Sequence, residues 1–424
     1  MAKIDTLCVH AGHNPGKGEP RQIPIIQSTT FKYETSDQMA RLFDLQDAGY
    51  FYSRLQNPTV DQTAAQINAL EGGVGAILTS SGQAANLFAV INIAGAGDHI
   101  IAANNIYGGT FNLLGVTLPK LGIDITFLKA DATDAEIEAA IKPNTKLIFG
   151  ETLSNPGVEV FDLERWAATA HRSGLPLIVD NTFPTPVLCR PFEWGVDIVT
   201  HSTTKYIDGH GVSVGGAVVD SGAFPWDKYP ERFPGLTQPD ESYHGLTYTK
   251  AFGKSAYIVK ATTHLMRDLG AIQSPQNAFY LHLGLQTLHL RMKRHSESAL
   301  QVARWLQACP DVAWVKYPGL QENNSLAKKY LPDGCSGVMA FGLKGGRAFD
   351  NRFLDALKLI TIETHVADCH TCVLHPASHT HRQLSDEQLR AAGIAPDLIR
   401  LSIGLEAPED IIEDIEQALN AARQ

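Results

Sequence analysis

The chain has 424 residues, of which 44% are hydrophobic and 19% are charged. These values predict a globular protein with a large core and two or three domains, and they exclude a disordered or fibrous chain. The formal net charge of −10, with no clustered basic run, argues against nucleic acid as a partner.

The sequence shows no targeting or membrane segment. Its first twenty residues lack the apolar stretch of a signal peptide, and nowhere do eighteen apolar residues follow one another. Six scattered cysteines are typical of reduced thiols and not of a disulfide framework. We therefore expect a cytoplasmic protein with no membrane partner.

Residues 1–57 carry many turn formers and little helical periodicity, so we expect an extended arm that can lie across another subunit. The arm ends in YFYSRLQNPT, where Tyr52 and Arg54 stand two residues apart and would project the same way from an extended backbone. A phenol beside a guanidinium can clasp a phosphate. The alternative is a surface arginine packed on a tyrosine.

A helix is predicted from Pro58 to the glycines at 72 and 73. The following stretch, AILTSSGQAANLFAVINI, reads as strand, turn and helix, with Ser81, Gly82 and Gln83 at the helix entrance. Free N–H groups and the helix dipole make such an entrance an anion site, although an ordinary capped helix has the same pattern.

Strands and helices then alternate to residue 220, which predicts a parallel sheet covered on both faces. Tyr107 follows one strand, where it can stack on a cofactor ring and move a proton, or simply be a buried aromatic. Asn155 follows another strand, where it can bind a cofactor oxygen or a substrate carboxylate, or be a turn residue.

Residues 177–216 hold the strongest chemical signal. The runs LIVD and VDIVT read as buried strands whose ends deliver Asp180 and then the HSTTK segment, in which Ser202, Thr204 and Lys205 lie. A carboxylate, hydroxyl groups and an amine in one crevice suit pyridoxal phosphate, because they can hold its pyridinium nitrogen, its phosphate and its aldehyde as a Schiff base. Each residue alone has an ordinary structural explanation.

From residue 221 onward, the sequence predicts an irregular segment followed by a smaller domain. Residues 221–253 interrupt the alternation with Pro, Gly and aromatic residues, which is typical of a functional segment or an interface. Helical patterns and a strand then indicate a second α/β domain. We place the arm at 1–57, the large domain at 58–266 and the C-terminal domain at 267–424.

Residues 363–385 contain five histidines and a Cys369-x-x-Cys372 pair. Neither the paired motifs of a structural zinc site nor the context of a redox CxxC is present, so no metal is expected. Further on, LIRLSIGLE reads as a buried strand with one cation, Arg400, which should meet a carboxylate.

VDNTF and HSTTKYIDGHGVSVGG resemble the Cys/Met-metabolism family of pyridoxal-phosphate enzymes, and the similarity extends from TLCVHAG to LIRLSIGLE. The family includes cystathionine γ-synthase, methionine γ-lyase and O-acetylhomoserine sulfhydrylase. The chain departs from the family pattern at Ala367, where glycine is common, and at Cys369 and Cys372.

The resemblance implies an aspartate-aminotransferase-type (fold type I) α/β fold, with a mostly parallel central sheet and a smaller C-terminal α/β domain, and a role for each candidate residue. Lys205 would be the Schiff-base lysine and Asp180 the pyridinium partner. The cofactor would be bound by Tyr52 and Arg54 of a neighbouring subunit, and by Ser81, Gly82, Gln83, Tyr107, Asn155, Ser202 and Thr204. The substrate would be bound by Arg400, at its α-carboxylate, with Asn155 and Tyr52.

The resemblance of the 221–253 insertion to the sulfhydrylase branch implies the reaction of O-acetyl-L-homoserine with sulfide to give homocysteine and acetate, with Lys205, Tyr107 and Asp180 as catalytic residues. The alternatives are a methionine γ-lyase, an O-succinylhomoserine sulfhydrylase and a non-catalytic pyridoxal-phosphate-binding regulator. A nicotinamide oxidoreductase is disfavoured because GGVG and GAG do not continue as GxGxxG. We expect a homo-oligomer, a dimer of dimers, whose partners are an amino acid and sulfide.

Overall fold

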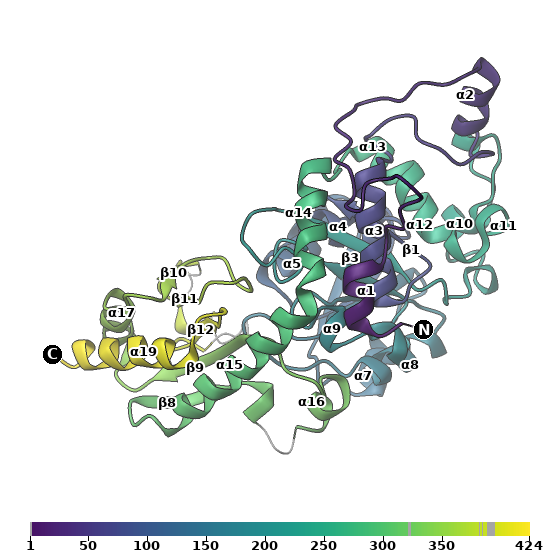
Figure 1. The fold of residues 1–424 in the computed structure, drawn as a ribbon. Helices are drawn as coiled ribbons and strands as arrows, with labels where there is room; N and C mark the ends of the chain where they lie inside the picture. The colour runs from purple at the N-terminus through teal and green to yellow at the C-terminus, as the bar shows by residue number, and fades with distance from the viewer. Residues whose placement is uncertain (1, 321–323, 381, 384, 388–394) are drawn as a thin grey trace.

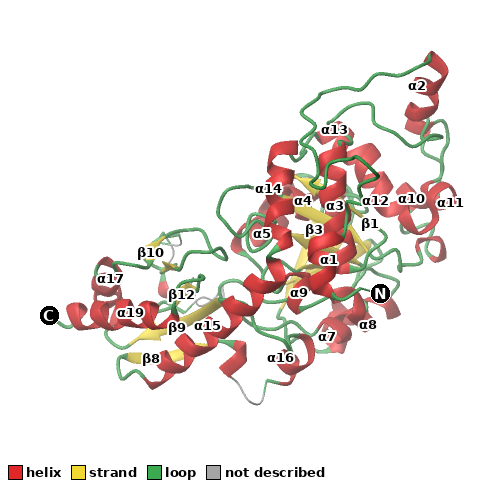
Figure 2. Cartoon of the chain, in the orientation of Figure 1, coloured by secondary structure: helices red, strands yellow, loops and turns green. Residues whose placement is uncertain are grey.

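A computed structural model describes residues 2–320, 324–380, 382–383, 385–387 and 395–424 (Figure 1). The strands form two separate groups, each flanked by helices (Figure 2). The first sheet lies within residues 75–220 and the second within residues 312–402. The domain boundaries at residues 57 and 266 remain predictions.

The large sheet has seven strands in the order β1-β7-β6-β5-β4-β2-β3. Strand β7 runs antiparallel to both of its neighbours, whereas the other pairs are parallel. The predicted mostly parallel α/β sheet is therefore confirmed. The strands are β1 (Gly75–Thr79), β2 (His99–Ala103), β3 (Asp124–Leu128), β4 (Thr145–Glu151), β5 (Leu177–Asp180), β6 (Ile198–His201) and β7 (Gly216–Asp220).

Capping residues set the helix ends. Helix α3 (Pro58–Glu71) begins after Asn57, whose side chain accepts the Thr59 N–H, and it ends at Gly72 with φ +82°.

Twelve further α-helices follow the first strand in the described residues up to residue 308. They are α4 (Gly82–Ile91), α5 (Gly108–Asn112), α6 (Leu118–Lys120), α7 (Asp134–Ala140), α8 (Leu163–Arg172), α9 (Thr185–Leu188), α10 (Pro234–Thr237), α11 (Tyr248–Phe252), α12 (Ala256–Lys260), α13 (Arg267–Leu269), α14 (Pro275–Gln286) and α15 (Leu288–Ala308).

The smaller sheet has the order β10-β11-β12-β9-β8. Its strands are β8 (Val312–Lys316), β9 (Val338–Leu343), β10 (Thr361–Ile362), β11 (Cys372–Leu374) and β12 (Ile399–Ser402). Helices α16 (Ser325–Tyr330), α17 (Gly346–Asp355) and α19 (Pro408–Ala422) complete this part. The predicted second α/β unit is present, and its strands β11 and β12 carry the cysteine and arginine singled out in the sequence.

The arm differs from the expected extended chain, because it contains α1 (Ile4–His10) and α2 (Ser36–Phe43). Helix α2 has a local start signal, since the Thr35 hydroxyl accepts the Gln38 N–H and the Gln38 side chain accepts the Glu34 N–H. Helix α1 packs on α3 of its own chain, where the Gln66 side chain donates to the Cys8 carbonyl. Only the segment around α2 projects from the body (Figure 1).

The 221–253 insertion folds around aromatic side chains. Phe224, Trp226 and Phe233 contact one another, and Trp226 stacks on Tyr257 of α12 with ring centroids 5.6 Å apart. The segment therefore packs beside α12 on the large domain. Its tip also approaches the arm, where His244 lies 3.6 Å from Asp44.

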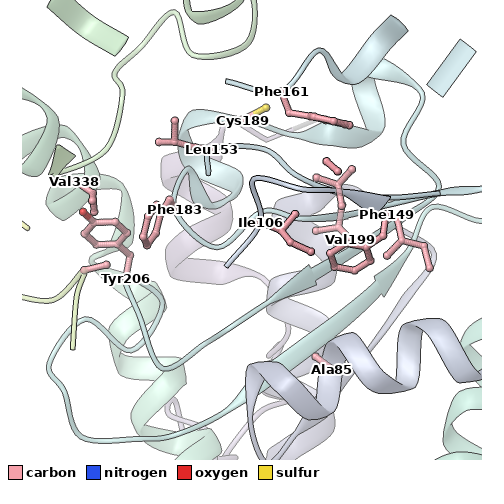
Figure 3. Packing of buried hydrophobic residues seen from close by; sticks show 14 of the residues in the cluster. Ala85, Ile106, Phe149, Leu153, Phe161, Phe183, Cys189, Val199, Tyr206 and Val338 are labelled. Carbon is pink, nitrogen blue, oxygen red and sulfur yellow. The ribbon is translucent and has the colours of Figure 1, made fainter. Parts of the chain in front are cut away.

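One continuous buried cluster joins the two parts of the molecule. Figure 3 shows some of its members, including Phe149 on β4 and Val199 on β6. At the junction, the hydroxyl of the fully buried Tyr206 accepts the Gly337 N–H at 2.9 Å, just before β9. The strand ends of the large sheet are thus held against the smaller sheet.

Replacement of Phe149 by Ala should lower the free energy of unfolding by about 3–5 kcal/mol, because it leaves a cavity in the central sheet. Phe149 is fully buried, whereas Phe43 on α2 is half exposed, so Phe43→Ala serves as the matched control with a loss below about 1 kcal/mol. Urea unfolding followed by circular dichroism measures both. Equal losses in the two variants would contradict this account of the core.

Candidate active site

The carboxylate of Asp180 is buried at the end of β5. One oxygen accepts the Thr182 N–H at 3.0 Å and the Thr182 hydroxyl at 2.5 Å, and the other accepts the Asn86 amide at 3.3 Å. Burial raises the pKa of Asp180, although these hydrogen bonds and the nearby His201 oppose the rise. Within the described residues, no lysine or arginine forms an ion pair with this carboxylate, so the site can accept a cationic group beside it.

Asn86 is a site residue that the sequence reasoning missed. It lies on α4, and its amide oxygen accepts the Thr200 hydroxyl at 2.6 Å while its nitrogen donates to Thr110 and Asp180. It therefore fixes the helix behind the predicted anion site to strands β5 and β6. In the sequence, only its position one helical turn after the SSGQ helix entrance could have indicated that Asn86 belongs to the site.

Glu151 is a second residue that the sequence reasoning missed, although it ends β4 as Asp180 ends β5. The two residues are paired across the sheet, and burial together with the charge of Asp180 raises the pKa of Glu151 well above its ordinary value. Because Asp180 has three hydrogen-bond donors, we assign the negative charge to Asp180 and a proton to Glu151. Glu151 also accepts the backbone N–H of Tyr107 at 2.6 Å.

The predicted anion site brings two segments into close contact. Ser81 caps α4 by accepting the Ala84 N–H at 3.1 Å. A Cβ atom on Gly82 would lie 2.6 Å from the Cβ of Ser202, so only glycine fits there. The Thr204 hydroxyl lies between the N–H and the carbonyl of Gly215, and the Gln83 amide donates to Thr110. The phosphate roles of these residues remain predictions.

Lys205 follows β6 and directs its amine toward the smaller domain. Its Nζ lies 3.2 Å from Nδ1 of His365, which the sequence reasoning did not single out. Burial lowers the pKa of Lys205 to about 8, and the positive charge of Arg400 acts in the same direction. A neutral amine, which is the form that acts as nucleophile and base, is therefore accessible close to neutral pH.

Arg400 is buried on β12, but the expected carboxylate partner is not found among the described residues. Its guanidinium donates to the Asn155 side chain at 3.3 Å and to the carbonyls of Thr364 and His365 at 3.2 and 3.0 Å. Burial lowers the pKa of Arg400. A buried cation that has only neutral partners is suited to bind an anionic ligand.

Three predicted site residues, Tyr52, Arg54 and Tyr107, lie at the surface of this chain. Tyr107 is 46% exposed and occupies the N-cap position of the short helix α5, where its side chain makes no capping hydrogen bond and its ring is free to meet a ligand. Tyr52 is 43% exposed, and the guanidinium of Arg54 lies 5.3 Å from the centre of its ring. No described contact joins Tyr52 or Arg54 to Lys205 or Asp180 within the chain. Their participation in a site of another subunit remains a prediction.

The Cys/His segment forms a wall beside Lys205. Cys372 is buried, and its thiol contacts the His365 carbonyl at 3.3 Å, while the Cys369 thiol contacts the Gly209 carbonyl at 2.8 Å. Ala367 adopts a left-handed backbone conformation with φ +67°, which glycine takes more readily. No cluster of three or more potential metal ligands is present in the part of the chain that the structure describes, and His381 lies outside that part.

The arrangement fits pyridoxal phosphate. Asp180 supplies a buried carboxylate that forms no ion pair with a described lysine or arginine, Lys205 supplies an amine, and the α4 entrance supplies backbone donors for a phosphate. A connected path of contacts runs from Asp180 through Thr182 to the Ser202 N–H, two residues before Thr204 and three before Lys205. The carboxylate and the amine are thus held by one rigid set of strand ends.

Comparison with known proteins places these residues in a family. The model of the Cys/Met metabolism PLP-dependent enzymes matches residues 5–420. A homocysteine synthase of Schizosaccharomyces pombe is 45% identical over 99% of this chain and 98% of its own. The O-acetyl-L-homoserine sulfhydrylase 1 of Thermus thermophilus is 44% identical over 98% of this chain and 100% of its own.

A solved structure gives the same result for the fold. An O-acetylhomoserine (thiol)-lyase from Campylobacter jejuni has a TM-score of 0.95 and 39% identity, over 99% of this chain and 100% of its own. That protein contains N'-pyridoxyl-lysine-5'-monophosphate at position 205 of its chain. The fold type I architecture predicted from the sequence is confirmed.

The lowered pKa of Lys205 predicts when its amine becomes reactive. In protein freed of cofactor, trace acetylation followed by peptide mass spectrometry should show half-maximal labelling of Lys205 near pH 8. Ordinary lysines require a pH above about 10, and the exposed lysines of the same sample provide the internal reference. Half-maximal labelling of Lys205 above pH 10 would contradict the burial described for its amine.

Proposed function

The chain belongs to the Cys/Met metabolism family of PLP-dependent enzymes, and from this premise we propose that it converts O-acetyl-L-homoserine and sulfide into L-homocysteine and acetate. The relatives named homocysteine synthase and O-acetyl-L-homoserine sulfhydrylase support this reaction over a simple elimination. The single structural observation that carries the proposal is the buried Arg400 beside Lys205 and Asn155, a cationic pocket for the carboxylate of an amino acid next to a reactive amine.

Pyridoxal 5'-phosphate is the cofactor, and when bound it supplies an electron sink for the charge that develops on the substrate. In our proposal Asp180 keeps the pyridinium nitrogen protonated, since this buried carboxylate is stabilised by a cation beside it. Arg400 binds the α-carboxylate and Asn155 orients the guanidinium. Lys205 then removes the proton from Cα, because its lowered pKa leaves it a neutral amine near neutral pH.

The surface residues Tyr52, Arg54 and Tyr107 complete the proposal. Tyr107 would lie over the cofactor ring, with its backbone held by Glu151. Tyr52 and Arg54 would bind the cofactor phosphate of a neighbouring subunit, with Ser81, Gly82, Gln83, Ser202 and Thr204 supplied by that neighbour itself. The protein would then be an obligate homodimer, paired into a tetramer.

The compartment that we propose is the cytoplasm. All six cysteines are unpaired, as is usual in a reducing compartment. No helix in the described residues has the length and apolar character needed to cross a membrane.

Covalent attachment tests the role of Lys205. Borohydride reduction should fix pyridoxal on the peptide that contains Lys205, and Lys205→Ala should lose turnover by several orders of magnitude because both attachment and proton transfer need the amine. Lys260 is the matched control, since burial also lowers its pKa to about 8 but it lies beside Asn92, away from the strand ends. A label on Lys260 or on another lysine would reject the assignment.

Subunit mixing tests the shared site. Arg54→Ala and Lys205→Ala proteins should each be inactive, but a mixture that exchanges subunits should regain activity, because one combination of chains supplies both side chains. Native mass spectrometry of differently tagged subunits confirms exchange. No activity after proven exchange would show that Arg54 does not act across the interface.

Product analysis tests the reaction itself. With O-acetylhomoserine at saturating sulfide, homocysteine and acetate should form in equal amounts, and methionine should be a poor substrate. Assays with O-succinylhomoserine compare the two leaving groups. Abundant 2-oxobutyrate and ammonia with only traces of homocysteine would identify a lyase instead.

A further inference from the structure

The turn between β10 and β11 places a histidine and an aspartate in line with the Lys205 amine. His365 Nδ1 lies 3.2 Å from Lys205 Nζ, and His365 Nε2 lies 3.4 Å from Asp368 Oδ2. The second contact is long for a hydrogen bond, as contacts of catalytic groups often are before substrate binds. Histidine exchanges protons near neutral pH, and its two nitrogens allow it to accept at one and donate at the other.

The turn is fixed from three sides, so this alignment is a property of the fold. Arg400 donates to the His365 carbonyl at 3.0 Å and the Cys372 thiol contacts the same oxygen. The Ala367 N–H donates to the Ser402 hydroxyl at 2.8 Å, in the left-handed turn between the histidine and the aspartate. His365 is therefore held by strands β11 and β12 with its ring toward Lys205.

The charges around His365 favour the tautomer that carries its proton on Nε2, facing Asp368, and leaves Nδ1, facing Lys205, as a hydrogen-bond acceptor. Asp368 is buried, and burial acts to raise the pKa of its carboxyl, but the contact with His365 and the hydrogen bond from the His370 N–H outweigh burial and hold that pKa below its ordinary value. Lys205 and Arg400 are the cations on the other side, and the thiol of Cys372, whose pKa burial raises to about 12, stays neutral. With Nε2–H directed at Asp368, Nδ1 accepts a hydrogen bond from Lys205.

We propose that His365, positioned by Asp368, is a proton relay that accepts a proton from the Lys205 ammonium during the reaction. The proposal rests on the proposed function, because a γ-replacement removes one proton from Cα and one from Cβ before acetate leaves. Lys205 as a single amine holds only one of these protons. Transfer of the first proton from the Lys205 ammonium to His365 Nδ1 restores a neutral amine for the second.

Lys205 and His365 together account for both protons that leave the substrate. The Cα proton passes through Lys205 to His365, which becomes an imidazolium beside the Asp368 carboxylate, and the Cβ proton then resides on Lys205. Acetate leaves with the electron pair of its C–O bond, and hydrosulfide donates the pair that forms the new C–S bond. Lys205 returns its proton to Cβ, receives the other proton from His365 and delivers it to Cα. Two protons leave the substrate and two return.

Hydrogen exchange in D₂O tests the relay with an amino acid that has no leaving group. Wild-type holoenzyme with L-norvaline should exchange Cα and Cβ hydrogens, as followed by proton NMR. His365→Asn keeps an acceptor for Lys205 but cannot carry a proton, so Cβ exchange should fall about 10²-fold and Cα exchange less than about threefold. Asp368→Asn should act in the same direction.

His370→Asn is the matched control, since His370 also lies near Asp368, at 4.0 Å, but its side chain is 78% exposed. Both exchange rates should be unchanged in this variant. Equal slowing at Cα and Cβ in His365→Asn, a Cβ effect in His370→Asn, or a wild-type enzyme that exchanges Cα alone would each overturn the relay.

A second measurement needs no turnover. In protein freed of cofactor, His365→Leu removes the acceptor for the Lys205 ammonium, so the pH of half-maximal acetylation of Lys205 should fall by about half a unit or more, whereas His365→Asn should leave it unchanged. A rise in His365→Leu would mean that the imidazole already carries a proton, which would overturn the relay. Normal exchange by an enzyme that makes no homocysteine would reject the proposed function and keep the relay.

Discussion

A carboxylate buried without a strong cationic partner is the constraint on which the rest of this structure depends. Asp180 is 8% exposed, and ionised carboxylates at such depth are stable only with several hydrogen-bond donors or an opposite charge. Thr182 and Asn86 supply the donors. A cationic group of a ligand can supply the opposite charge. The same strand ends also present an amine and a glycine-lined helix entrance, so one ligand can contact all three.

Much of the surrounding structure fixes that carboxylate in place. Asn86 joins helix α4 to Asp180 and to Thr200, and the fully buried pair of His201 and Glu71, 2.7 Å apart, is linked to the residue after Asp180, Asn181, whose amide donates to Glu71. Burial and the charge of Asp180 raise the pKa of Glu151, whose carboxyl accepts the Tyr107 N–H and so positions that residue. Side chains held by such hydrogen bonds lose less conformational entropy when a ligand binds than freely rotating ones would, so the site is pre-organised.

The sequence predicted the features that lie within one strand and the turn after it. Asp180 and Lys205 follow buried apolar runs, and Ser81 and Gly82 open a helix, so their place at the strand ends could be predicted before the fold was known. Glu151 carries the same strand-end signal as Asp180, but Asn86 and His365 could not be assigned in this way, because their partners are up to 160 residues distant and only tertiary packing brings them together. The helices of the arm could not be predicted, because a short capped helix such as α2, of 8 residues, is too short for a clear periodicity.

The most direct test of the account is the protonation state of the bound cofactor, read from the ¹⁵N chemical shift of its pyridine nitrogen in protein loaded with labelled pyridoxal phosphate. The account predicts a protonated nitrogen in the wild-type protein and a neutral one in Asp180→Asn, with Thr182 and Asn86 unchanged. A nitrogen that is neutral in the wild type, or that stays protonated in Asp180→Asn, would show that the buried carboxylate is not the partner around which this site is built.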